Sequence, residues 1–198
     1  MMRPNLAQDT PPSAISVGGV SYDVDTDYRV WLDVLRDMRL LKTQTQSMDD
    51  FNENAERILD IETRVFGQRI PHPANDVLSA IADFAKGYPS APTGEGKAHA
   101  PTYSFDWDIN YILLAIHVQY GIDLSAQAGN KLHWWMFLLY FNALCGDHYI
   151  LRLMEIRGYD GKDKDLRQQA YRFALPKDEA EQAEDAAILD IFNKISPE

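Results

Sequence analysis

The chain has 198 residues, 45% of them hydrophobic, which suffices for one domain with a sizeable core. Its net charge of −11, from 30 acidic and 19 basic residues, argues against a nucleic-acid partner, since such binding needs cations that neutralise phosphates. The single cysteine, Cys145, cannot form an intramolecular disulfide, so nothing suggests an oxidising compartment. No apolar run reaches the roughly 20 residues that cross a bilayer, and the first residues lack the apolar core of a secretion signal. We therefore expect a cytosolic protein with no membrane partner.

The first 24 residues are expected to contain a tail and a small hairpin. Residues 1–14 are polar, carry three prolines, and are predicted to be a disordered N-terminal tail. Apolar residues then alternate on both sides of Gly18-Gly19, a pair that suits a two-residue turn with positive φ. The alternating residues are Ile15, Val17, Val20, Tyr22 and Val24. This pattern predicts a β-hairpin at the start of a single domain over residues 15–176.

Three helices are expected next. Capping side chains and one-sided apolar spacing predict an amphipathic helix over residues 26–42. Ser47 and Asp50, three positions apart, predict the start of a second helix that ends at Gly67. We expect these two helices to form an antiparallel pair. A shorter helix over 75–87 follows a proline-rich break.

Residues 88–104 are rich in proline and glycine and are predicted to be a flexible loop, acting as a hinge or as an interaction segment. Ser104 or Asp106 can cap the next helix, over residues 105–120, which should end at Gly121. We expect this helix to pack beside the central helix. Apolar residues line up on one face of it, and Ile112 and Ile116 widen that face. That face consists of Trp107, Tyr111, Leu114 and Val118.

The stretch from Leu132 to Cys145, LHWWMFLLYFNALC, contains only two polar side chains, His133 and Asn142. A helix that is apolar on nearly every side must be surrounded by other elements. The sequence therefore predicts a mainly α, compact helical domain around a buried central helix. Two further short helices are expected after it, over residues 150–156 and 163–174.

Few residues suggest catalysis or metal binding. Of the side chains that could ligate a metal, Cys145 and His148 alone lie three apart, and Gly146-Asp147 should break the helix between them. Cys145 is expected to be a small buried hydrophobe, and His117 and His133 are expected to lie at the core edge with hydrogen bonds to backbone or tyrosine. The full set of candidate ligands is His117, His133, Cys145 and His148. We expect no metal and no cofactor.

Two carboxylate pairs, Asp106 with Asp108 and Asp163 with Asp165, are spaced by two, which places their members on different helix faces. They fit helix caps and solvated surface better than a shared acid/base site. No glycine-rich phosphate motif occurs. The sequence therefore predicts a protein that is not an enzyme.

Charge is distributed unevenly near the end of the chain. Residues 151–176 hold six basic and four acidic residues, and residues 177–198 hold seven acidic and two basic ones. The basic stretch is either a landing site for an acidic segment or, about twice as plausibly, a solvated face. Residues 177–198 are predicted to form an acidic C-terminal amphipathic helix that docks weakly or on a partner. The predicted partner-binding residues are Arg152, Arg167, Arg172, Ile188, Leu189, Ile191, Phe192 and Ile195; Arg157, Lys162 and Lys164 complete the basic stretch.

Several segments resemble a known family in order and spacing. They are DTDYRVWLDVL after the hairpin, YSFDWDINYILLAIHVQYGIDLS, KLHWWMFLLYFNAL, ILRLMEIRGYDGKD and DLRQQAYRFALP. Over residues 17–176 the chain resembles the tailed-bacteriophage family called gene product fifteen. The most specific pieces are packing signatures, such as the aromatic-acidic entry to the helix over 105–120 and the Leu132-His133-Trp134-Trp135 start of the central helix.

The resemblance implies a tail assembly chaperone of a long-tailed phage, a small helical protein of the host cytoplasm. Its implied partner is the tape-measure protein, and other tail proteins are possible partners, as is a second copy of the chain. It would bind that long helical chain through exposed apolar faces and leave as the tail tube polymerises. Expected contact regions are the loop at 88–104, the exposed sides of the first two helices, and residues 188–195. The alternative is a structural virion component of the tail or the head-tail connector.

Overall fold

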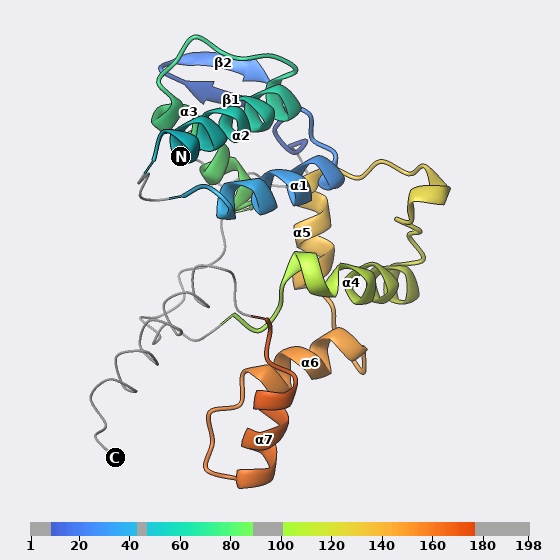
Figure 1. Cartoon of the computed structure of the whole chain (residues 1–198). Coiled ribbons are helices and arrows are strands. Elements are labelled where there is room, and N and C mark those ends of the chain that lie inside the picture. The colour runs from blue at the N-terminus through green and yellow to red at the C-terminus, as the bar shows by residue number, and fades with distance from the viewer. Residues whose placement is uncertain (1–8, 43–46, 89–100, 177–198) are drawn as a thin grey trace, which may run out of the picture.

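The computed structural model describes residues 9–42, 47–88 and 101–176 (Figure 1). The described residues form a two-stranded hairpin, seven α-helices and one turn of 3-10 helix, which confirms the mainly α prediction. No helix among them is long and apolar enough to span a membrane. In chain order the elements are β1 (Ala14–Val17), β2 (Val20–Asp23), α1 (Tyr28–Arg39), α2 (Met48–Phe66), α3 (Ala74–Ala85), α4 (Phe105–Tyr120), η1 (Ala126–Ala128), α5 (Trp134–Asn142), α6 (Tyr149–Arg157) and α7 (Lys164–Arg172).

The predicted β-hairpin is present. Strands β1 and β2 pair antiparallel with Val17 opposite Val20. Gly18 and Gly19 form the turn with φ of 58° and 82°, the left-handed values that a tight hairpin turn of this kind requires. Ile15 and Val17 are buried, and β1 packs against α3. The hairpin therefore covers one side of the helical core.

Part of the predicted N-terminal tail contacts the fold. Strand β1 begins at Ala14, one residue earlier than expected. The carbonyl of Ser13 accepts the Val24 amide at 2.9 Å, and the carbonyl of Pro12 lies 2.9 Å from the His133 ring. Residues 1–8 lie outside the described part of the chain.

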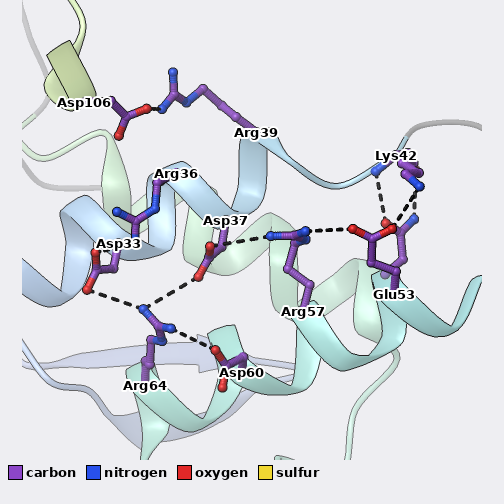
Figure 2. Close-up of polar contacts among 11 residues, drawn as sticks. Asp33, Arg36, Asp37, Arg39, Lys42, Glu53, Arg57, Asp60, Arg64 and Asp106 are labelled. Atoms are coloured by element: carbon purple, nitrogen blue, oxygen red, sulfur yellow. Dashed lines mark hydrogen bonds and ion pairs between the residues drawn. The ribbon is translucent and has the colours of Figure 1, made fainter. Parts of the chain in front are cut away.

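Helices α1 and α2 form the expected antiparallel pair, joined by ion pairs along their contact (Figure 2). Asp33, early in α1, lies 3.4 Å from Arg64 late in α2, whereas Asp37 lies 3.7 Å from the earlier Arg57. This reversed order of partners fixes the antiparallel direction. Most of these side chains are partly solvated, so the pairs set the register of the two helices more than they add stability.

Helix ends follow the predicted caps. Ser47 and Asp50 form a reciprocal capping box, each side chain accepting the other's backbone amide at 3.1 Å. Gly67 ends α2 with a left-handed φ of 72°. Asp27 caps α1, which ends at Arg39, three residues before the predicted limit. Local capping chemistry thus sets most of the helix boundaries.

Helix α5 lies at the centre of the core, between α1 and α4 (Figure 1). Three of its side chains, Trp134, Phe137 and Phe141, are buried. The Trp134 ring stacks on Trp31 of α1 with centroids 6.4 Å apart, and its indole N–H donates to the Ala85 carbonyl at 2.9 Å. The prediction of a central aromatic helix is therefore correct in place and character.

The central helix is shorter than predicted. His133 is its N-cap and Asn142 its last residue, so the expected span of 132–145 contracts at both ends. Cys145 lies beyond the helix on an exposed turn, and the prediction that it is a small buried hydrophobe is wrong. The helix ends three residues before the cysteine, so the apolar character of the neighbouring residues does not bury it.

Helices α6 and α7 form a separate layer below α4 (Figure 1). Helix α7 packs on α6 and has no buried residue. The last residue of α6, Arg157, connects this layer to the rest of the fold. Its guanidinium donates to both carboxylate oxygens of Asp108 in α4, at 2.6 and 3.1 Å, and to the Phe173 carbonyl at 2.7 Å.

Asp108, predicted to fit a helix cap or solvated surface, accepts the Ser104 amide at the start of α4, but its ion pair with Arg157 contradicts the prediction of solvated surface. The Asp108 side chain is only 2% exposed, and Arg157 is buried with it rather than contributing to a basic face. The end of the predicted loop is also packed: Tyr103 contacts the Phe141 ring with centroids 4.8 Å apart. The rest of that loop, residues 89–100, lies outside the described residues.

Candidate binding surface

Helix α4 is fixed at both ends by its own sequence. The Ser104 hydroxyl accepts the Asp106 amide at 3.3 Å, and the Asp108 carboxylate accepts the Ser104 amide at 2.9 Å. Gly121 ends the helix with a left-handed φ of 70°, and its amide donates to the His117 carbonyl. The helix boundaries therefore match the predicted ones.

Two attachments set the rotation of α4 about its axis. Asp108 points inward to Arg157, and Asp106 pairs with Arg39 of α1, which faces it in Figure 2. Ile112 and Ile116, together with the small Ala115, form the buried side. With these residues turned inward, the adjoining side of α4 must face solvent.

The solvent-facing side of α4 is apolar. Trp107, Tyr111, Leu114 and Val118 are 63%, 42%, 59% and 65% exposed. Their spacing of four, three and four residues places them on one stripe of the helix. Helix α4 packs beside the central helix α5, as predicted. Its buried residues include Ile112, Ala115 and Ile116, however, and the four residues of the stripe are exposed.

The stripe continues onto α6. Tyr149, also exposed, contacts the Tyr111 ring edge to face with centroids 4.8 Å apart. We call Trp107, Tyr111, Leu114, Val118 and Tyr149 together the α4 apolar face. A contiguous exposed set of large apolar side chains marks an interaction site. The spacing along α4 is also that with which one helix anchors against another.

Other exposed apolar residues are less extensive. On α2, Met48, Phe51 and Leu59 are exposed; the first two lie together at its start, next to residues 43–46, which lie outside the described part. On α7, Leu166 and Tyr171 are exposed. These sets hold three side chains on α2 and two on α7, whereas the α4 apolar face joins five across two helices.

The arginines predicted to form a basic binding patch each contact a different neighbour. Arg152 pairs with Asp147, and hydrogen bonding to Arg152 lowers the pKa of that carboxyl. Arg167 donates to the Lys162 carbonyl at 3.1 Å, and Arg172 lies over the Phe173 ring. With Arg157 buried, the basic stretch is divided between α6 and α7. The predicted apolar contacts, Ile188, Leu189, Ile191, Phe192 and Ile195, lie outside the described residues.

The candidate metal ligands have structural partners. His133 is half-buried, and burial lowers its pKa. Its Nδ1 accepts the Trp135 amide at 3.0 Å and its Nε2 lies 2.9 Å from the Pro12 carbonyl, which suits a neutral imidazole protonated at Nε2. The Cys145 amide and the His148 ring both contact the Gln119 side-chain oxygen, at 3.0 and 3.1 Å.

His117 is exposed on α4, so the prediction of a core-edge histidine fails there. Among residues 9–42, 47–88 and 101–176, no three His, Cys, Asp or Glu side chains could hold a metal ion. A hollow of about 320 Å³ lies between α1 and α4, but Asp33 and Asp106 on its wall are already paired with arginines. The described residues thus present an apolar surface as their most distinctive feature.

Sequence reasoning missed this surface because α4 is apolar on two sides. The signal that could have indicated the rotation is Ala115, a small residue between larger ones, which permits close approach on its own side. Asp108 obscured that signal, because a carboxylate predicts solvent and its buried partner Arg157 lies 49 residues away.

Comparison with known proteins shows the family of the chain. The model of the family described as "Bacteriophage Gp15 protein" matches residues 7–177. No curated protein and no solved structure matches the chain. The match covers every helix and strand described above and most of the sequence. The chain therefore belongs to the bacteriophage Gp15 protein family.

Proposed function

We propose that this phage protein is a tail assembly chaperone that binds the tape-measure protein during tail morphogenesis and catalyses no reaction. The observation that supports the proposal most is the α4 apolar face on a chain with a net charge of −11. An assembly chaperone needs an apolar surface that accepts helical segments and a charged exterior that keeps the complex soluble.

The geometry suits a helical partner. An amphipathic helix that repeats apolar residues at three- and four-residue intervals can lie along α4 and contact Trp107, Leu114 and Val118 in turn. At about 1.5 Å per residue, the 11 steps from Trp107 to Val118 span roughly 16 Å, or three turns of such a helix. In this proposal the complex forms in the host cytoplasm and dissociates as tail-tube subunits assemble.

The test is capture of the same phage's tape-measure protein by the full chain and by a variant of the α4 apolar face. Leu114→Asp/Val118→Asp should weaken capture about 100-fold, because two partly exposed apolar contacts contribute roughly 3 kcal/mol when buried. Co-purification at matched concentrations and titration with tape-measure fragments measure the change.

A matched control uses an apolar pair that lies elsewhere. Met48→Asp/Phe51→Asp makes the same chemical change on exposed residues of α2 and should leave capture unchanged. Circular dichroism should show equal helicity for both double variants. Equal loss of capture in both, or none in either, would contradict binding through α4. Stoichiometric presence of the protein in purified particles would instead indicate a structural virion component.

A further inference from the structure

The acidic segment, residues 177–198, has a composition that matches the α4 apolar face. Its apolar residues lie at relative positions 0, 1, 3, 4 and 7, so a helix formed there would present them on one side. They are Ile188, Leu189, Ile191, Phe192 and Ile195. In helical form they would extend about 10 Å, which fits within the roughly 16 Å stripe on α4.

The path of the chain brings this segment close to α4. The Arg157 guanidinium donates to the Phe173 carbonyl at 2.7 Å and to the Thr102 carbonyl at 3.1 Å, and it also donates to the Asp108 carboxylate. The last described residues therefore lie beside the first turn of α4, where Trp107 is exposed. Figure 1 shows the chain after α7 returning to this end of α4.

The connection is long enough. From Pro176 to Ile188 the chain has 12 steps, and an extended chain covers about 3.3–3.6 Å per residue. It can therefore reach roughly 40 Å, whereas α4 with its 16 residues is about 24 Å long. Every position along the α4 apolar face, on either side of the helix, lies within reach.

Charge favours the same contact to a smaller degree. Arg152 lies one helical turn after Tyr149 and is exposed at the border of the α4 apolar face. Two acidic residues, Glu184 and Asp185, come shortly before the apolar residues of the segment and can approach this arginine. Arg152 already pairs with Asp147, so apolar contact contributes most of the affinity.

We propose that residues 188–195 dock on the α4 apolar face of the same chain and compete there with the chaperone's partner. A tether of this length gives an effective concentration of about 1 mM, so an intrinsic Kd of about 0.1 mM keeps the face roughly nine-tenths occupied. A partner then meets an open face about one-tenth of the time, and its apparent affinity falls about tenfold.

Photo-crosslinking tests the docking without any partner. The full chain carries p-benzoylphenylalanine in place of Tyr111, and equal amounts of ¹⁵N-labelled and unlabelled protein are irradiated together. Mass spectrometry should find crosslinks to residues 188–195 in which both peptides carry the same label. Ile188→Asp/Phe192→Asp should reduce their yield about tenfold, and a crosslinker at the exposed Leu59 of α2 should not capture the segment.

Either of two results would overturn the proposal. Mixed-label crosslinks would show that a second copy occupies the face, and an absence of crosslinks to residues 188–195 would show that the segment does not dock there. The regulatory step rests on the proposed function: Ile188→Asp/Phe192→Asp should tighten capture of tape-measure fragments about tenfold. If no fragment binds any variant, the proposed function fails, while the crosslink still decides the docking.

Discussion

The region around α1 and α5 and the region formed by α6 and α7 are held by different interactions. In the first, aromatic rings stack in a closed core, as Trp31, Trp134 and Phe137 show. In the second, α6 buries Ile150 and Leu153, α7 buries no residue, and the Arg157 guanidinium adds a buried ion pair to α4. The first region depends on stacked buried rings, whereas the second buries few side chains and includes a buried charge pair, so a single substitution should affect them differently.

The largest expected effect is in the aromatic region. Trp134→Ala removes a fully buried ring and the indole donor to Ala85, and should lower the free energy of unfolding by about 3–5 kcal/mol. Urea unfolding measures the loss. Tyr171→Ala on α7, where the ring is 86% exposed, is the control and should change stability by less than about 0.5 kcal/mol. Comparable losses in the two variants would refute the contrast between the regions.

The next effect should be local. Arg157→Met leaves the Asp108 carboxylate buried without its cation and should destabilise the fold by about 3 kcal/mol. Hydrogen exchange should accelerate in α6 and α7 while α1 and α3 stay protected, since the second region opens first.

The matched control for that variant removes both charges. Asp108→Leu/Arg157→Met should recover most of the lost stability, because no charge is left buried without a partner. If the single and the double variant unfold at the same urea concentration, the ion pair does not attach the α6–α7 layer as described.

The smallest effect concerns pH in the first region. Burial holds the pKa of His133 below its ordinary 6.5. Between the two pKa values, His133 is therefore protonated in the unfolded chain but neutral in the folded chain. The folded state should therefore lose stability as pH falls below about 6.5 towards the folded pKa. His133→Asn replaces the Nδ1 cap acceptor by an amide oxygen and cannot titrate, so urea midpoints between about pH 5 and 7.5 should show a flatter dependence on pH. A slope unchanged by the substitution would assign the dependence to other groups.

Sequence reasoning located most elements because their signals are local. Ser47, Asp50 and Gly67 bound α2 through side chains and φ values that act within one turn, and Gly18-Gly19 shaped the hairpin in the same way. The mainly α class followed from the same periodic patterns.

Sequence reasoning did not predict which side of α4 faces the core. Helix α4 has apolar residues on two sides, and its buried side is selected by Arg157, a residue distant in sequence, and by Ala115, which permits close packing. No spacing within α4 contains that information. Sequence reasoning placed the exposed residues of α4 on one face together with the buried Ile112 and Ile116, and only the tertiary contacts separate the two sets.

The meeting of α1 and α5 at their N-terminal ends has a consequence for biosynthesis. The Trp134 amide donates to the Thr26 carbonyl, and the Tyr28 hydroxyl donates to the Leu124 carbonyl, 96 residues further along the chain. Helix α1 leaves the ribosome first, but it can bury Trp31 fully only after α5 has been synthesised. During translation the hairpin and α1 to α3 expose surfaces that α5 later covers, and such intermediates are the ones that aggregate. We expect slower synthesis between α3 and α5 to lower the yield of folded protein more than the same delay after α7.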